Sequence, residues 1–232
     1  MKKIAMFIAA AAVAVSASAQ PRTTITANKA GDNIYVGVNA GALTGLKNQD
    51  SNNKTAFKVF TPEFGVRVGK NFTTVFGLAI DANLYFNALK KGNVNRASKT
   101  FVQGLDIDLL GTANLMNMFA GYKGQPRKFE IIALGGFGWS HGFNMDNKKV
   151  NGLNSKVALD FALNLGEKKA WQVYLEPGLT YALVGWADGK INKHAQNFQY
   201  NVNRAAFSLK AGVNYKFGTS NGTHNFACEQ LR

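Results

Sequence analysis

The chain has 232 residues, a formal net charge of +14 and a hydrophobic content of 46%. One cysteine, Cys228, excludes an internal disulfide, and 24 glycines against 4 prolines favour strands and turns over helices. Beyond residue 20, no run of about 18 apolar residues is present that could form a membrane-spanning helix.

The first nineteen residues have the pattern of a cleavable signal peptide. Lys2 and Lys3 precede an apolar run over residues 4–15, and Ala17-Ser18-Ala19 is typical of a cleavage site. The run is shorter than the roughly 20 residues of a spanning helix. We therefore expect export, with residues 1–19 removed, a lead over residues 20–32 and a mature charge of +12. A basic exported chain is expected to meet anionic lipid or polysaccharide rather than nucleic acid.

Eight segments alternate between apolar residues and small or polar residues, which is the period of a β-strand. They cover residues 33–42, 58–69, 76–86, 101–115, 129–140, 156–165, 171–183 and 206–217. Most reach the roughly 9–11 residues that a tilted strand needs to cross a bilayer, whereas ordinary strands average about 5–6. A soluble sandwich also alternates, but the second face here is mostly Gly, Ala, Asn and Asp. Such a face favours a narrow lumen inside a lipid-facing barrel.

The links between these segments also alternate, in length. Residues 70–74, with a tight turn expected at Lys70-Asn71, and residues 166–170 are short, whereas 43–57, 88–100, 141–155 and 185–205 are long and polar. Bacterial barrels have short periplasmic turns and long outer loops. The link 116–128 is an exception, and its start at residues 115–119 predicts an amphipathic turn at the inner interface or a short buried helix. Unpaired strand edges are costly in hydrocarbon, so the eight strands are expected to close.

Aromatic residues near the strand ends are expected to form two girdles at the membrane interfaces. They are Phe72, Phe86, Phe101, Phe129, Trp139, Trp171, Trp186 and Phe217.

The same alternation places a set of charged residues inside the barrel. They are Glu63, Arg67, Asp81, Asp106, Asp108, Glu130, Asp160, Glu176 and Lys210, of which Glu63, Asp81, Asp108, Asp160 and Lys210 fall at similar heights. Buried charge is costly unless it is paired, so we expect Arg67 and Lys210 to bridge several carboxylates and plug the lumen. A cation-selective constriction is the alternative, because acidic rings favour cations. The plug is favoured since side chains can fill an eight-stranded interior.

Most of the positive charge falls on the long links and their rims, which we place on the outer face. This basic surface comprises Lys90, Lys91, Arg96, Lys99, Lys148, Lys149, Lys190 and Lys193, with Lys156 at the rim. Two interpretations stand side by side. The loops are simply a solvated surface, or they bind the phosphates and acidic sugars of lipopolysaccharide by an attraction that salt screens.

A lipid-modifying enzyme is the main rival class, and such an enzyme needs a base close to a nucleophile. The histidines are His141, His194 and His224, and Ser140-His141 are neighbours that point to opposite faces of a strand. The single cysteine and scattered histidines lack the spacing of metal ligands, and Gly135-Gly136-Phe137-Gly138 lies within a strand rather than a phosphate-binding loop. We therefore predict no catalytic residues, metal or cofactor.

The eight segments, the last strand 207–217 with its terminal Phe217 and the tail 220–226 resemble the OmpA-type outer-membrane β-barrel domain over nearly the whole mature chain. The resemblance implies an all-β, eight-stranded antiparallel up-and-down transmembrane barrel over 33–217 with a periplasmic tail over 218–232. It also implies a Gram-negative outer membrane, with lipid, lipopolysaccharide and the barrel-assembly machinery as partners. The peptidoglycan-binding domain of longer relatives has no counterpart before Arg232, so cell-wall anchoring is not expected.

A role in envelope integrity, with surface contacts through the basic loops, is therefore the predicted function. A narrow pore for small solutes or cations is the alternative. The sequence leaves the oligomeric state open.

Overall fold

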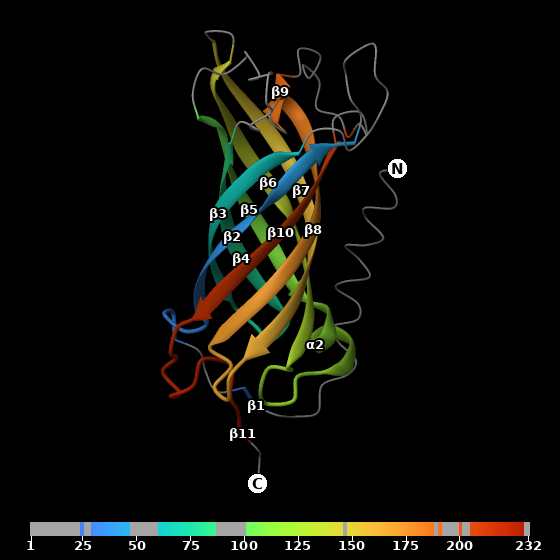
Figure 1. Ribbon diagram of the computed structural model, residues 1–232. Coiled ribbons are helices and arrows are strands. Elements are labelled where there is room, and N and C mark those ends of the chain that lie inside the picture. The colour runs from blue at the N-terminus through green and yellow to red at the C-terminus, as the bar shows by residue number, and fades with distance from the viewer. Residues whose placement is uncertain are drawn as a thin grey trace.

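Eight long antiparallel strands form one closed barrel in the computed structural model (Figure 1). The structure describes residues 24–25, 29–46, 60–86, 101–145, 148–187, 190–191, 200 and 205–229. The barrel strands are β2 (Ile34–Gly45), β3 (Thr61–Asn71), β4 (Phe76–Phe86), β5 (Val102–Asn114), β6 (Phe129–Met145), β7 (Lys148–Leu165), β8 (Trp171–Ala187) and β10 (Ala205–Lys216). Strand β10 pairs with both β8 and β2, which closes the ring. The predicted eight-stranded up-and-down barrel is confirmed.

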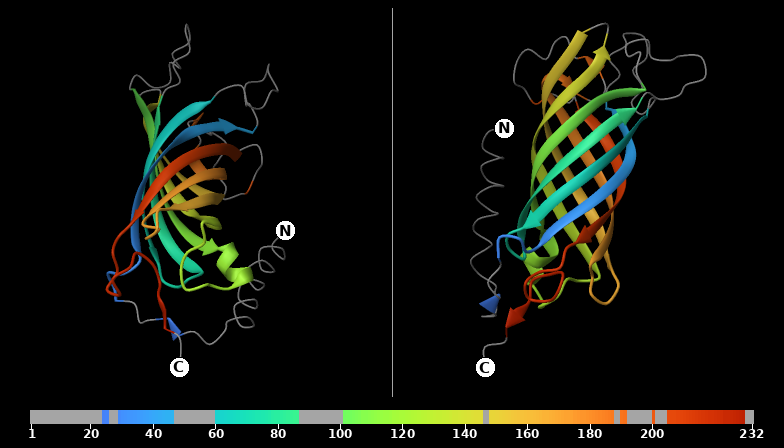
Figure 2. Two further views of the ribbon diagram at one scale, coloured as in Figure 1. Left: turned by 60° about the horizontal axis from the view of Figure 1, so that its bottom comes forward. Right: turned by 90° about the vertical axis from the view of Figure 1, so that its left-hand side faces the viewer.

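The remaining elements are short. They are α2 (Leu115–Ala120), β9 (Lys190–Ile191), and the pair formed by β1 (Thr24–Ile25) and β11 (Cys228–Glu229). Figures 1 and 2 place α2, β1 and β11 at one end of the barrel. We call it the short-turn end, because the turns at residues 72–75 and 166–170 lie there, and we call the opposite end the long-loop end. In the described part of the chain, no helix is long and apolar enough to span a bilayer.

The link after β5 begins with the short helix α2, but this helix is not the buried one expected, because Asn117 is its one buried residue. The Asn114 side chain caps α2 by accepting a hydrogen bond from the Asn117 backbone amide at 3.0 Å. The buried Asn117 side chain donates to the Thr74 carbonyl at 2.8 Å, while Phe119 is 69% exposed. The helix is therefore pinned to the barrel on its polar side and presents an aromatic ring outward.

Two predicted links differ from the structure. Much of the expected polar link 141–155 is strand, since β6 runs to Met145 and β7 starts at Lys148, with a register shift between Gly142 and Met145. Strand pairing continues there although the segment has no apolar face, because the backbone hydrogen bonds of a hairpin can form without burial of its side chains. The expected tight turn at Lys70-Asn71 is also wrong. Asn71 still belongs to β3, and the turn follows at residues 72–75.

Side chains alternate between the two faces of the barrel as predicted. In β4, the outward-facing Leu78 and Ile80 are 43% and 51% exposed, whereas Asp81, the residue that follows Ile80, is fully buried. Large exposed apolar residues cover the outside of the other strands as well, among them Val66, Val68, Leu109, Phe137, Leu159, Phe161, Leu163, Leu175 and Leu209. The largest fully buried side chains include Arg67 and Lys210. This distribution is the reverse of a soluble core and suits a barrel surrounded by lipid.

Aromatic side chains gather near the ends of the apolar belt. At the short-turn end, Phe72, Phe129, Trp171 and Phe217 are exposed. At the other end, Phe86 and Phe101 lie with their ring centroids 5.2 Å apart. Of the other aromatics expected in the girdles, Trp139 stacks on His141, and Trp186 falls where only the backbone is described.

Candidate functional site

A cluster of three cations and three carboxylates crosses the lumen near mid-height. Its members are Arg67, Lys156 and Lys210 with Asp81, Asp160 and Glu176, and each side chain is 5% exposed or less. They project from β3, β4, β7, β8 and β10. We call this set the lumen cluster. Its formal charge is zero, which is the condition under which charges can be buried at tolerable cost.

Arg67 is the hub of the lumen cluster. Its two terminal nitrogens reach Asp81 at 3.0 Å, Asp160 at 3.0 Å and Glu176 at 2.5 Å. The guanidinium also lies 5.0 Å from the centre of the Tyr174 ring, which adds a cation–π contact. A planar group with a fixed fork of donors is suited to bridging three strands at once.

Lys156 and Lys210 complete the cluster from β7 and β10, the two strands that pair with β8. Both ammonium groups contact Asp81, at 3.0 and 2.9 Å, and both contact Glu176, at 2.8 and 3.2 Å. The placement of Lys156 at the outer rim is therefore wrong. Strand β7 begins eight residues earlier, at Lys148, so Lys156 is not at a strand end but within the barrel. Its alternation with the outward Val157 was the signal that could have placed it in the lumen.

Two tyrosines narrow the lumen by lying across glycines of the neighbouring strands. A Cβ added at Gly69 would be 2.2 Å from Tyr35 Cζ, and one added at Gly212 would be 2.3 Å from Tyr174 Cζ. Tyr35 lies directly opposite Gly69 on the neighbouring strand, and Tyr174 lies directly opposite Gly212. The absence of a side chain at these glycines is what makes room for the rings.

The remaining predicted carboxylates lie outside the lumen cluster. On its long-loop side, Asp106 accepts a hydrogen bond from the Tyr85 hydroxyl at 2.7 Å, and Glu63 and Asp108 are buried without an ion pair to any described residue. All five residues of the predicted polar layer are buried, but Glu63 and Asp108 are not joined to it by ion pairs among the described residues. The position of a residue along its strand does not determine how far its side chain reaches, and this reach decides which carboxylates contact a cation.

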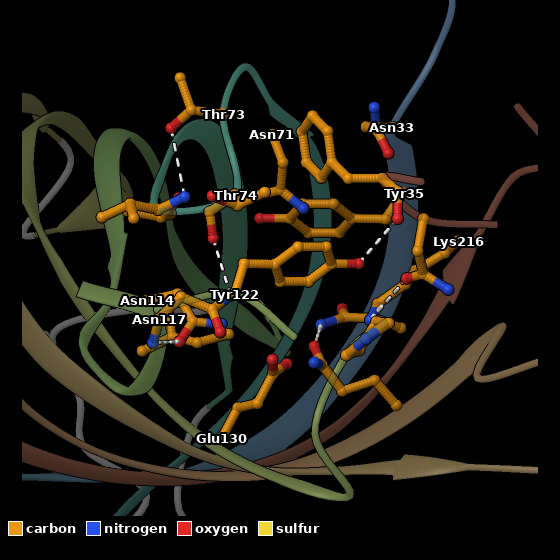
Figure 3. Close-up of a pocket in the computed structure, with 18 of the residues that line it drawn as sticks. Asn33, Tyr35, Asn71, Thr73, Thr74, Asn114, Asn117, Tyr122, Glu130 and Lys216 are labelled. Carbon is orange, nitrogen blue, oxygen red and sulfur yellow. Dashed lines mark hydrogen bonds between the residues drawn. The ribbon is translucent and has the colours of Figure 1, made fainter. Parts of the chain in front are cut away.

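Glu130 lies at the short-turn end, below the lumen cluster, where it points into a cavity (Figure 3). Its carboxylate accepts a hydrogen bond from Asn164 Nδ2 at 2.8 Å. Asn164 Oδ1 in turn accepts from Lys216 Nζ at 2.8 Å and from Gln172 Nε2 at 3.0 Å. Lys216 was not among the predicted lumen residues, and its alternation with the outward Phe217 would have indicated an inward side chain.

Most residues of the predicted basic surface lie outside the part of the chain that the structure describes. Lys90, Lys91, Arg96, Lys99 and Lys193 lie outside the described residues. Lys148, Lys149 and Lys190 lie in β7 and β9, where only the backbone is described. The surface therefore stays a prediction.

The candidate Ser140-His141 pair is split between the two faces of β6. Ser140 is buried in the lumen and accepts a hydrogen bond from Asn154 Nδ2 at 2.9 Å. His141 stacks on Trp139 at 5.5 Å and contacts Asn151 Oδ1 at 2.8 Å. His224 contacts the Lys216 carbonyl, and His194 lies outside the described residues. Within the described ranges, no group of three or more His, Cys, Asp or Glu residues could hold a metal ion.

A closed eight-stranded barrel with an apolar outer belt and an ion-paired lumen defines the class of small outer-membrane β-barrels. Solved structures of that class share the fold. Neisserial surface protein A is 13% identical with a TM-score of 0.51, and the match covers 80% of this chain and 98% of that one.

Two further barrels show weaker matches. The N-terminal barrel of Pseudomonas aeruginosa OprF is 10% identical over 79% of this chain and 97% of that one, with a TM-score of 0.46. Ail of Yersinia pestis is 8% identical over 79% and 98%, with a TM-score of 0.41. No protein-family model and no curated protein matches the sequence. The comparisons thus establish the fold, and the role has to be argued from this chain's own residues.

Proposed function

We propose that the protein is a structural β-barrel of a Gram-negative outer membrane whose lumen does not conduct, and whose basic outer loops contact the anionic cell surface. The lumen cluster carries the first part of this proposal. Seven ion-pair contacts between 2.5 and 3.2 Å tie five strands together across the waist of the barrel.

Opening this waist would separate charges that have little access to water. Removing one partner of a buried ion pair typically costs about 3–5 kcal/mol, so a spontaneous rearrangement that leaves a charge unpaired is rare. The apolar side chains Leu110, Leu134 and Ala158 form an additional buried cluster inside the barrel. A filled and internally paired waist supports a role in stabilising the envelope rather than in transport.

Planar-bilayer recording tests the closed lumen. The refolded wild-type protein is expected to give no steady unitary currents under conditions in which a large porin, added as a positive control, conducts. The variant Arg67→Ala/Lys156→Ala, which removes two of the three cations, is expected to leak. Steady wild-type currents with cation selectivity would reject the plug in favour of the narrow pore.

The basic outer loops support the second part of the proposal. Each lysine close to an anionic membrane surface contributes about 1 kcal/mol, and this attraction falls with ionic strength. Replacing Lys90, Lys91, Lys148 and Lys149 by Gln is therefore expected to weaken binding to lipopolysaccharide vesicles by at least about tenfold at low salt.

A matched control keeps the change in charge but moves it to the opposite end. The variant with Gln at Lys29, Lys123, Lys128 and Lys168, at the short-turn end, is expected to bind lipopolysaccharide like the wild type. Binding that is insensitive to salt and to the outer-loop substitutions, or equal loss in both variants, would reject a specific role for the outer loops.

A further inference from the structure

The short-turn end of the barrel contains a cavity that the lumen cluster does not use. Its volume is about 70 Å³, which is room for roughly five water molecules, and it is in part open to solvent (Figure 3). Five water molecules occupy about 150 Å³ of liquid, so the cavity suits only a small ligand. Seven of the eight barrel strands contribute to its lining, all but β4.

The chain after β10 covers this cavity. The Tyr122 hydroxyl donates to the Phe226 carbonyl at 2.8 Å, and the two rings meet edge to face with centroids 6.5 Å apart. Asn225 Nδ2 donates to the Lys168 carbonyl at 3.2 Å. On the other side of the mouth, the Ser220 hydroxyl and amide donate to Asp32 at 2.6 and 2.8 Å. The tail is thus fixed at several points and leaves the space beneath it unfilled.

The loop that carries Tyr122 is itself held in place. Arg127 donates to the carbonyls of Ala120 at 3.0 Å and Gly121 at 2.6 Å, and it contacts the Asn117 side chain. The rigidity of this loop matters because a binding site must keep its shape when no ligand is bound.

The lining is rich in neutral polar groups. Amides and hydroxyls line the cavity at Asn33, Asn71, Thr73, Thr74, Thr112, Asn114, Asn117, Gln172, Asn214 and Asn225. Amide side chains both donate and accept, which suits a ligand with many hydroxyl groups. The aromatic residues Tyr35, Tyr122 and Phe226 add flat apolar surface.

The carboxylates of the lining are compensated by Lys216 within it and by Arg67 outside it. Asp160 is paired with Arg67 at 3.0 Å, and Glu130 and Lys216 are linked through Asn164 at 2.8 Å each. A site without surplus charge gives no preference to an anion or a cation. It therefore favours a neutral polar ligand.

We propose that this cavity binds a small neutral polyhydroxy compound, no larger than a monosaccharide, from the short-turn side. The inference is independent of the closed lumen and of the outer loops. It needs only the lining, the balanced charges and the tail that covers them.

Isothermal titration calorimetry on the folded protein in detergent tests the site, with glucose and N-acetylglucosamine as neutral probes and glucose 6-phosphate as the anionic comparator. Both neutral sugars are expected to bind, and the anion to bind more weakly. Asn214→Ala is expected to weaken binding about three- to tenfold, which corresponds to one hydrogen bond. Asn71→Ala, at the less buried rim, provides a second pocket variant in case Asn214→Ala does not fold.

Asn151→Ala is the matched control, because Asn151 lies in β7 near the long-loop end beside His141. It is expected to bind both sugars like the wild type. The proposal is overturned if neither neutral sugar binds, if the folded pocket variants bind unchanged, or if Asn151→Ala loses binding equally. None of these results would alter the conductance or the lipopolysaccharide binding of the wild type.

Discussion

Replacement of Arg67 by Met is the most direct test of the lumen cluster. The change removes contacts to Asp81, Asp160 and Glu176 and leaves three carboxylates with two lysines. The cluster then carries one uncompensated negative charge at a site that is almost free of solvent. We expect the free energy of unfolding to fall by about 3–5 kcal/mol, or roughly two to four orders of magnitude in the folding equilibrium.

Urea titration in lipid vesicles, followed by the heat-modifiable shift in gel migration, measures this loss. Lys70→Met is the control on the same strand, because among the described residues Lys70 Nζ binds the carbonyls of Ala30 and Asp32, at 2.7 and 2.6 Å, and no carboxylate. Its cost is expected to stay near 0.5–1.5 kcal/mol per hydrogen bond lost.

The double variant Arg67→Met/Asp160→Asn separates charge from packing. Asp160 has its ion pair with Arg67, so neutralising both returns the cluster to zero formal charge. The double variant is expected to be more stable than the sum of the two single changes predicts, with a coupling of at least about 1 kcal/mol. An Arg67→Met variant within about 1 kcal/mol of the wild type, or strictly additive changes, would refute the argument.

Three further predictions concern the outer belt, the lumen and the tail. Ile80→Arg places a charge on the lipid-facing belt and should cost about 2–4 kcal/mol in vesicle unfolding, with no loss if Ile80 does not face lipid. Gly69→Ala forces its new Cβ against the Tyr35 ring and should cost about 1–3 kcal/mol, whereas an unchanged midpoint would show that the ring is free to move. Hydrogen bonds from Ser220 lower the pKa of Asp32. The contact between Asp32 and the tail should therefore be fully formed at pH values above the usual pKa of Asp, and it should be lost as the pH falls through the lowered pKa. The amide shift of Ser220 should follow this titration, and in Asp32→Asn it should be flat.

The sequence alone was sufficient for the overall architecture. Alternation with a period of two is a local property, so Leu78, Ile80 and Asp81 could be assigned to opposite faces without knowing any neighbour in space. Closure followed from the need to pair every backbone group in lipid, and eight segments fixed the strand number. The inward direction of Arg67 and Lys210 came from the same pattern.

Only the tertiary structure decided which of these side chains meet. Asp81 contacts Lys156 and Lys210, which are 75 and 129 residues away in the chain, and neither pairing has a local signal. Strand tilt and the reach of long side chains set the partners, so Glu63 and Asp108 are buried in the lumen without an ion pair among the described residues. Lys156 falls outside the predicted lumen for another reason, because the expected strand starts at residue 156 and β7 starts at Lys148. The cavity under Phe226 likewise depends on how the tail folds back across the barrel mouth. Alternation along a strand records the direction of each side chain, whereas contact depends on register and shear around the whole ring, which exist only once the barrel has closed.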